Sequence, residues 1–332
     1  MNLSRVLPFS AASLLLTIGC GGGSGPIVLP PGSASNIYVV QNPLTASDLN
    51  TILEFPANLQ GSVTPENTIT MSKSSLYAVA VDASGNLYAA TDTISNPSPT
   101  QIQILVYAPG ATGAATPTRT ITTTLSSSID SIAVDSIGQI YALSENTINI
   151  FAANATGNAT PIRQITSSLI NHPYAMAVDS ANNIYVATGY YNPNIVVFSA
   201  AANGDIESPR TITGSNTQLG YVSLGIAVDA TGDIFVATQS GTSPYVSTVL
   251  EFAPNANGNA VPIKTLTAVS SYAIGGIKVD TAGNLFVVVE NIGNLRFAVD
   301  VFLPTATDSD PPVETISSAA WTYSSLGQLA IQ

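Results

Sequence analysis

The sequence predicts an all-β fold, a six-bladed β-propeller, from three observations. A motif recurs with a period near 50 residues, which indicates radial or linear repetition. Each repeat holds four short runs rich in Val, Ile, Thr and aromatic residues, separated by turn residues. One copy of the motif is divided between the two ends of the chain. Four antiparallel strands per repeat, arranged in a closed ring, leave only short protected edges.

Five copies of the motif are intact and contain an aspartate at the same place: Asp82, Asp135, Asp179, Asp229 and Asp280. The first reads LYAVAVDASGNLYAAT and the fourth LGIAVDATGDIFVAT. The chain ends with the first half of such a unit at 329–332, and 35–40 supply the second half. We therefore expect the C-terminal strand to pair with the N-terminal blade.

The strands of the unit around Asp229 are expected at 225–229, 233–238, 248–253 and 262–267. Short Gly- and Asn-containing segments join the first two strands, as in tight hairpins. The shared blade combines 36–71 with 324–332, and the other five are expected at 74–122, 128–166, 172–213, 221–267 and 272–316.

Aromatic residues repeat at two positions of every blade, as expected if rings pack between neighbouring sheets. The second strands carry Tyr38, Tyr88, Tyr141, Tyr185, Phe235 and Phe286. The third strands carry Phe55, Tyr107, Phe151, Phe198, Phe252 and Phe302.

Over residues 36–332 the chain resembles the NHL-repeat propellers, whose units run roughly P-x-G-I-A-V-D-x-x-G-N-I-Y-V-A. The segments at 108–113 and 253–258 also resemble those of bacterial secreted proteins of this type. The resemblance implies a propeller fold. It implies little about function, because propellers host many unrelated functions.

Residues 1–20 are expected to be a lipoprotein-type signal peptide. Arg5 precedes an apolar stretch too short to span a bilayer, and 16–20, Leu-Thr-Ile-Gly-Cys, resembles a bacterial lipobox. Cys20, the only cysteine, is the expected lipidation site, and 21–35 form a Gly-, Pro- and Ser-rich linker. The expected location is the bacterial cell envelope, lipid-anchored at the outer membrane or cell surface. Ordinary secretion is the alternative.

The composition suits an extracytoplasmic all-β protein, with 45% apolar but only 8% charged residues. The formal net charge is −12. An acidic chain without basic clusters is not expected to bind nucleic acid, and contact with a membrane is expected only through the N-terminal lipid. Four bases recur at one position of the outermost strands and are expected to protect strand edges: Arg119, Arg163, Arg210 and Lys264.

Aromatic residues outside the framework are expected on one face, on strand 2–3 loops, inter-blade loops or adjacent strand ends. Tyr and Trp provide large contact area with a polar tip, which suits sugars and extended peptides. The expected ligand-binding face comprises Tyr77, Tyr174, Tyr190, Tyr191, Tyr221, Tyr245, Tyr272, Trp321 and Tyr323, with His172 beside them; Phe297 belongs to the same group. The alternative is that these rings only cap the blades and close the channel.

The residue just after the second strand carries a side-chain oxygen in five blades. The set is Asn42, Asp92, Glu145, Gln239 and Glu290, with Gly189 in the remaining blade. Calcium prefers several oxygen ligands, so these residues form a candidate metal site. Loop-start polar residues without a shared ion are the alternative.

Other candidate chemistry is poorly supported. The five motif aspartates are expected to hydrogen-bond their own turns rather than form a ligand ring. A Ser-His-Asp triad could use only His172, the single histidine, which stands in a turn context. No catalytic residue is therefore assigned.

The sequence favours a monomeric, non-catalytic binding or scaffold propeller without a required cofactor. Its aromatic-rich face would engage a glycan, peptide or protein partner. The alternative is a calcium-dependent hydrolase or lyase of the lactonase type.

Overall fold

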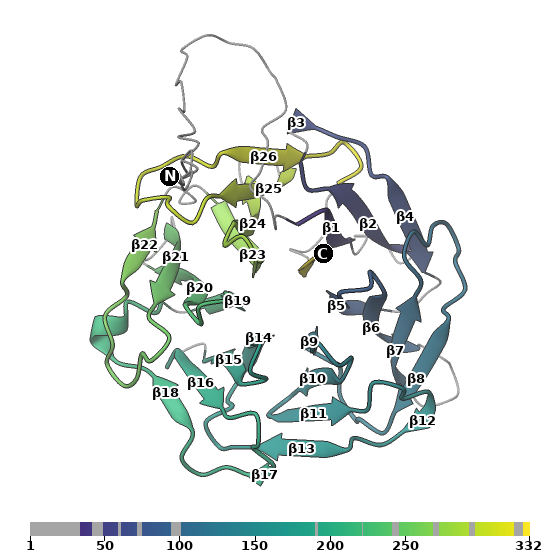
Figure 1. Ribbon diagram of the computed structural model, residues 1–332, viewed down its shortest axis with the longest axis horizontal. Helices are drawn as coiled ribbons and strands as arrows, with labels where there is room; N and C mark the ends of the chain where they lie inside the picture. The colour runs from purple at the N-terminus through teal and green to yellow at the C-terminus, as the bar shows by residue number, and fades with distance from the viewer. Residues whose placement is uncertain are drawn as a thin grey trace, which may run out of the picture.

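In the computed structural model, six small antiparallel sheets are arranged radially around a common axis, which confirms the predicted six-bladed propeller (Figure 1). The structure describes residues 34–41, 49–58, 61–71, 75–93, 101–189, 192–220, 222–240, 246–267, 272–291, 296–321 and 328–332. The expected signal peptide and the linker up to residue 33 lie outside these residues. In the described part no helix is long and apolar enough to cross a membrane.

Each blade contains four antiparallel strands, numbered here from the axis outward. The innermost strands are β27 (Leu329–Ile331), β5 (Leu76–Val81), β9 (Ser131–Val134), β14 (Pro173–Val178), β19 (Val222–Val228) and β23 (Tyr272–Val279). The second strands are β1 (Asn36–Gln41), β6 (Leu87–Thr93), β10 (Ile140–Ser144), β15 (Ile184–Thr188), β20 (Ile234–Ser240) and β24 (Leu285–Asn291).

The two outer positions of each blade follow the same order around the ring. The third strands are β2 (Asn50–Pro56), β7 (Gln101–Tyr107), β11 (Thr147–Phe151), β16 (Asn194–Phe198), β21 (Val246–Phe252) and β25 (Arg296–Phe302). The outermost strands are β4 (Asn67–Met71), β8 (Arg119–Thr123), β13 (Arg163–Thr166), β18 (Arg210–Ile212), β22 (Lys264–Leu266) and β26 (Glu314–Ser317). One short 3-10 helix, η1 (Ser215–Thr217), follows β18.

The ring closes through the C-terminal strand, as predicted. β27 pairs antiparallel with β1, with Leu329 opposite Val39 and Ile331 opposite Ile37. The ladder continues beyond β27, because the Ser35 N–H donates to the Gln332 carbonyl at 2.7 Å. The first blade therefore takes its innermost strand from the far end of the chain.

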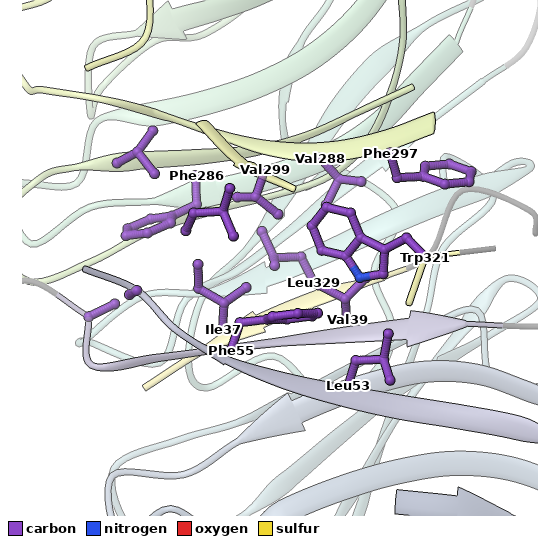
Figure 2. Close-up of a cluster of buried hydrophobic side chains, with 14 residues drawn as sticks. Ile37, Val39, Leu53, Phe55, Phe286, Val288, Phe297, Val299, Trp321 and Leu329 are labelled. Carbon is purple, nitrogen blue, oxygen red and sulfur yellow. The ribbon is translucent and has the colours of Figure 1, made fainter. Parts of the chain in front are cut away.

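Apolar side chains fill the spaces between neighbouring blades, and each main cluster spans such a seam. Figure 2 shows the seam between the sixth and first blades, where Phe286 and Val299 face Ile37 and Phe55. Phe55 and Phe286 are fully buried. Side chains alternate between the two faces of a strand, so the large apolar residues at every second position pack against the next sheet. The repeated aromatic residues predict this packing.

The motif aspartates hold their own hairpin turns, which confirms the structural interpretation. Asp82 Oδ1 accepts the backbone N–H groups of Ser84 and Asn86, both at 2.9 Å. Its Oδ2 accepts the Asn86 amide at 2.9 Å and the Tyr88 hydroxyl at 3.1 Å. The third residue after the aspartate has positive φ, which explains Gly85 (φ 81°). Equivalent Oδ1 bonds occur at Asp135, Asp179, Asp229 and Asp280.

The outer edge of each blade is covered by the 3–4 loop of the following blade. Three of these loops add a short parallel strand to the neighbouring edge: β12 (Gly157–Ala159) on β8, β17 (Gly204–Asp205) on β13 and β3 (Gly61–Ser62) on β26. Two others form single parallel bridges, Ile69–Gly113 and Ile212–Gly258. The edges of these five blades are therefore paired, and their outermost strands need no charged side chains to shield them.

This arrangement gives the four recurrent bases a different role from the one predicted. Arg210 Nη1 donates to the carbonyls of Pro254 and Ala256 in the next blade, at 3.0 and 2.7 Å. Arg119 donates to Ala153 and to Ala155, and Arg163 donates to Ala200. Lys264 Nζ reaches the Pro304 carbonyl at 2.9 Å. Each base is an inter-blade clamp that binds otherwise free loop carbonyls.

Two blades lack a base at this position. Asn67 begins β4 and donates to Glu54 Oε2 of its own blade at 3.0 Å. Glu314 begins β26, is 2% exposed, and both its carboxyl oxygens are without a hydrogen-bond partner in the described part of the chain. Burial raises the pKa of Glu314 to about 7. The seam between the sixth and first blades therefore contains an acid where three others contain an arginine.

Candidate functional site

The propeller presents two different faces. Loops between first and second strands and between third and fourth strands line a common hollow, which includes Asp179, Thr231 and Pro254. We call this the hairpin face. Because consecutive strands are antiparallel, the 2–3 loops and inter-blade loops lie on the opposite side, which we call the aromatic face. The candidate site residues in the described part lie on the aromatic face.

Tyr77 and Asp92 form a fixed pair on this face. Tyr77 is in β5, and its hydroxyl donates to Asp92 Oδ2 at 2.9 Å. Asp92 is in β6 of the same blade, and its Oδ1 accepts the Ser75 N–H at 2.8 Å. The pKa of Tyr77 is raised, mainly by burial, and the hydrogen bond to the Asp92 carboxylate raises it further. Both groups are held by the sheet, so a half-buried phenol is fixed beside a carboxylate.

A second acidic pair lies in the adjacent blade. The Glu145 backbone N–H donates to Asp130 Oδ2 at 3.2 Å, and the Glu145 carboxylate accepts a hydrogen bond from Ser127. Glu145 has φ 50°, in the left-handed region, within the tight turn between β10 and β11. Burial raises the pKa of Asp130 to about 6; the Glu145 N–H opposes this rise and the Glu145 charge adds to it.

The two pairs belong to one acidic rim, defined here as Tyr77, Asp92, Asp130 and Glu145. The charge of Asp130 is the smallest cause of the raised pKa of Tyr77, and the innermost strands β5 and β9 are neighbours, so the two pairs lie near each other across the seam between the second and third blades. Carboxylates accept hydrogen bonds from hydroxyl, amide and cationic groups. The acidic rim can therefore bind a ligand rich in hydrogen-bond donors, with the Tyr77 ring as a contact surface.

The predicted metal ligands are only partly visible. Asn42 lies outside the described residues, and Glu290 is described by its β24 backbone alone. Gln239 donates to Ser247 Oγ at 3.2 Å within its own blade. Among the described residues no group of three or more His, Cys, Asp or Glu side chains is arranged to hold a metal ion. Asp92 and Glu145 thus remain as members of the acidic rim.

The residues predicted to form the aromatic binding face do not share one environment in the structure. Tyr174 is half-buried at the start of β14, and Tyr272 is described by its backbone in β23. Trp321 and Phe297 are 7% and 8% exposed and belong to the core between the sixth and first blades. Figure 2 shows Trp321 packed above Phe55. The remaining members lie outside the described residues: Tyr190, Tyr191, Tyr221, Tyr245 and Tyr323.

His172 is exposed in the loop that leads to β14. Its Nδ1 lies 2.7 Å from Asn171 Oδ1, and its carbonyl accepts the Gly189 N–H at 3.1 Å. Its φ of 50° is typical of a turn. Among the described residues, no carboxylate or serine is hydrogen-bonded to its ring.

The sequence interpretation missed Asp130. It stands five residues before Asp135, as Tyr77 stands five before Asp82 and Tyr174 five before Asp179. Aligned at this position the six blades read Tyr77, Asp130, Tyr174, Leu224, Gly275 and Gly327, and Asp130 is the one acid among them. Ser127 carries no comparable signal, because loop serines are abundant in this chain.

Comparisons with known proteins agree with the fold. No protein-family model and no curated protein match the sequence. The chain is similar to a crystal structure of a protein of unknown function from Bacteroides caccae, with a TM-score of 0.56, 10% identity, and coverage of 90% of this chain and 99% of that one.

Two further solved structures have lower scores. The WD40 domain of Toxoplasma gondii coronin has a TM-score of 0.48 and 12% identity, covering 84% of this chain and 66% of that one. A protein from Lactobacillus plantarum has a TM-score of 0.49 and 13% identity, covering 86% and 83%. At 10% identity the likeness to the Bacteroides caccae protein concerns the fold alone, and the two likenesses with TM-scores below 0.5 carry no argument.

Proposed function

We propose that this propeller is a non-catalytic binding module that engages a glycan, peptide or protein partner through its aromatic face. The observation that carries the proposal is the acidic rim, where the Tyr77 phenol is fixed to Asp92 beside Asp130 and Glu145. A ring held at low entropy cost and several oxygen acceptors suit a ligand with many hydroxyl or amide donors. Among such ligands a glycan fits best.

The opposite face supports the choice of side. Its motif carboxylates are engaged in their own turns, as Asp229 Oδ1 shows by accepting the N–H groups of Thr231 and Asp233, both at 2.9 Å. Acceptors that are already satisfied by backbone donors gain less from a ligand. In the acidic rim Asp130 and Glu145 each accept one bond, whereas Asp92 is 8% exposed and accepts two, so Asp130 and Glu145 have the most acceptor capacity left for a ligand.

The experiment is binding of the purified propeller to glycan and peptide arrays, followed by titration of the best glycan and the best peptide. Tyr77→Ala and Asp92→Asn should each weaken binding about tenfold or more, the loss expected for an anchoring contact. Asn255→Ala, on the hairpin face, is the matched control and should bind normally. Equal binding by all four proteins would contradict the proposal.

The predicted alternative, a calcium-dependent hydrolase or lyase of the lactonase type, is favoured by no contact in the described part of the chain. Calcium titration of chelator-treated protein separates the two functions. Heat of binding at or below millimolar calcium that disappears in Glu145→Gln would support the metal site. A binding module that captures its partner in chelator would support the proposal.

We further propose that the module belongs to the NHL-like propellers of the bacterial cell envelope. The motif around each turn aspartate and the lipobox-like segment ending at Cys20 support this assignment. A lipid at Cys20 and the linker that follows would hold the propeller away from the membrane surface.

A further inference from the structure

The centre of the propeller contains a cavity of about 200 Å³ that is lined by the innermost strands of all six blades. Six equivalent positions, each opposite the recurrent aromatic of the second strand, contribute to its wall. Five of them are alanines: Ala80, Ala133, Ala177, Ala227 and Ala330. The sixth is Lys278.

Lys278 is the one charged residue among the described residues that line this cavity. The other lining residues are Ala, Val and Ile. Surrounding protein lowers the pKa of Lys278 by desolvation, and no neighbouring charge contributes. In the described part of the chain its amine has neither a hydrogen-bond partner nor an ion-pair partner, and the one ion pair there joins Lys264 to Glu251 at 3.0 Å. Lys278 is half-buried in this wall, and an ammonium that is partly removed from water without a counterion is costly.

The nearby aspartates do not neutralise this amine. Asp280 directly follows the same strand, two residues after Lys278, but its Oδ1 accepts two backbone N–H groups and its Oδ2 accepts the Asn284 amide and the Ala34 N–H. Its side chain is directed to its own turn and to the first blade. The amine therefore keeps its full capacity of hydrogen-bond donors.

The cavity has an entrance on the hairpin face. A wider hollow of about 470 Å³ shares four of its lining residues, namely Val178, Val228, Val279 and Ile331. The inner cavity alone is several times larger than the roughly 30 Å³ that one water molecule occupies in the liquid. A molecule of a few heavy atoms can therefore reach Lys278 from this side.

We propose that the central channel is a binding site for a small aliphatic carboxylate, with its anionic group paired to the Lys278 ammonium and its hydrocarbon part against the alanine and valine walls. The carboxylate would supply the missing counterion. A hydrogen bond between charged groups is stronger than one between neutral groups, and a low dielectric constant strengthens it further. The apolar wall favours a carboxylate with methylene groups over phosphate or chloride. This site is separate from the acidic rim.

The test is isothermal titration with sodium acetate, butyrate and phosphate at 0.15 M ionic strength, where the negative field of the protein is largely screened beyond about 8 Å. Butyrate should bind more tightly than acetate, by about fourfold for each methylene group that becomes buried. Phosphate should bind more weakly than butyrate. The proposal would be overturned if butyrate at concentrations up to about 10 mM showed no binding, because a dissociation constant above that value means a negligible affinity.

The repeat supplies a matched pair of variants. Lys278→Met keeps the length of the side chain without its charge and should weaken butyrate binding about tenfold or more. The double variant Lys278→Ala with Ala227→Lys moves the amine to an equivalent position of the neighbouring blade and should restore binding. Unchanged binding in Lys278→Met would overturn the proposal.

A measurement on the unaltered protein keeps the test independent of whether the variants fold. The chain has three lysines, Lys73, Lys264 and Lys278. In protein labelled with carbon-13 at lysine Cε, Lys73→Arg and Lys264→Arg assign the third signal by elimination. Butyrate should shift the Lys278 signal and leave the other two unchanged. Shifts of equal size at all three lysines, or at none, would contradict a channel site.

Discussion

The ring of Trp321 meets the ring of Phe55 edge to face, with centroids 5.1 Å apart and planes inclined at 72°. The two residues belong to opposite ends of the chain, and both lie in the core that joins the sixth blade to the first. The contact means that the only tryptophan reports on ring closure, because its environment exists only when these blades meet.

Trp321→Ala should therefore destabilise the propeller by about 3–5 kcal/mol, the usual cost of truncating a buried large aromatic residue. Trp321→Phe should cost less, since the indole Nε1 has no hydrogen-bond partner in the described part of the chain. Urea denaturation followed by circular dichroism measures both. An unchanged midpoint for Trp321→Ala would place this residue outside the stabilising core.

Removal of residues 329–332 should prevent the propeller from folding to a monomer. Leu329 and Ala330 are buried, and the strand that they form covers the inner edge of β1. Loss of the strand removes apolar burial and exposes an edge that invites aggregation. Size-exclusion chromatography and thermal melting provide the measurement, with Gln332→Ala as the control that keeps the ladder. A truncated monomer that melts near the parent temperature would contradict closure through this strand.

Arg210→Met should loosen the seam between the fourth and fifth blades. The variant leaves the carbonyls of Pro254 and Ala256 without their charged donor, at a cost of about 1–3 kcal/mol. Amide exchange gives a local readout, because Gly258 N–H donates to the Thr211 carbonyl across the same seam at 2.7 Å. That amide should exchange faster in Arg210→Met and nearly normally in Arg210→Lys. Protection that is unaltered in Arg210→Met would show that the base does not hold the loop.

Glu314→Gln should become more stabilising as pH rises. Burial raises the pKa of Glu314 to about 7 in the folded protein, so the folded state binds a proton that the unfolded state releases above its ordinary pKa of 4.5. Glu314 therefore lowers the free energy of unfolding progressively between about pH 4.5 and 7, by up to about 3 kcal/mol at the upper end.

The measurement is the difference in unfolding free energy between Glu314→Gln and the parent protein at several pH values. Glu207→Gln, at an exposed position, controls for the loss of one negative charge. A difference that does not change with pH would mean that Glu314 is already paired or hydrated in the folded protein.

Cys20→Ser should move the protein from the membrane fraction to the soluble fraction, if the lipobox-like segment directs acylation. The measurement is fractionation of expressing bacteria, followed by detection of the propeller in each fraction. Membrane association that persists in this variant would remove the basis for a lipid anchor.

The fold could be predicted from the sequence because each blade repeats the same local chemistry. The motif aspartates show this well: Asp179 and its turn follow from an Asx-type pattern within five residues, and the structure has the expected bonds to Ala181 and Asn183. The closing strand could be predicted for a similar reason, since half a motif at one end needs the other half.

The site was less predictable because tertiary structure brings its members together from separate loops. The bond of Glu145 to Asp130 links two loops of one blade, and Asp130 lies near Tyr77 across a seam, so no local pattern encodes the site. Trp321 was predicted on the binding face only because it is an aromatic residue outside the repeated framework, and this prediction was wrong. An extra aromatic on a connecting segment was expected on a binding surface, but it lies 7% exposed in a core that only the closed ring creates.

The pairing of Ser35 with Gln332 across the first blade has a topological consequence. The first and last residues of the propeller are neighbours in one hydrogen-bonded ladder. The sheets of the ring therefore do not require the chain to start and stop in this blade. Joining residue 332 to residue 34 through a short linker and opening the chain in another hairpin, for instance between β10 and β11, would preserve every sheet while changing only the order in which the blades are made.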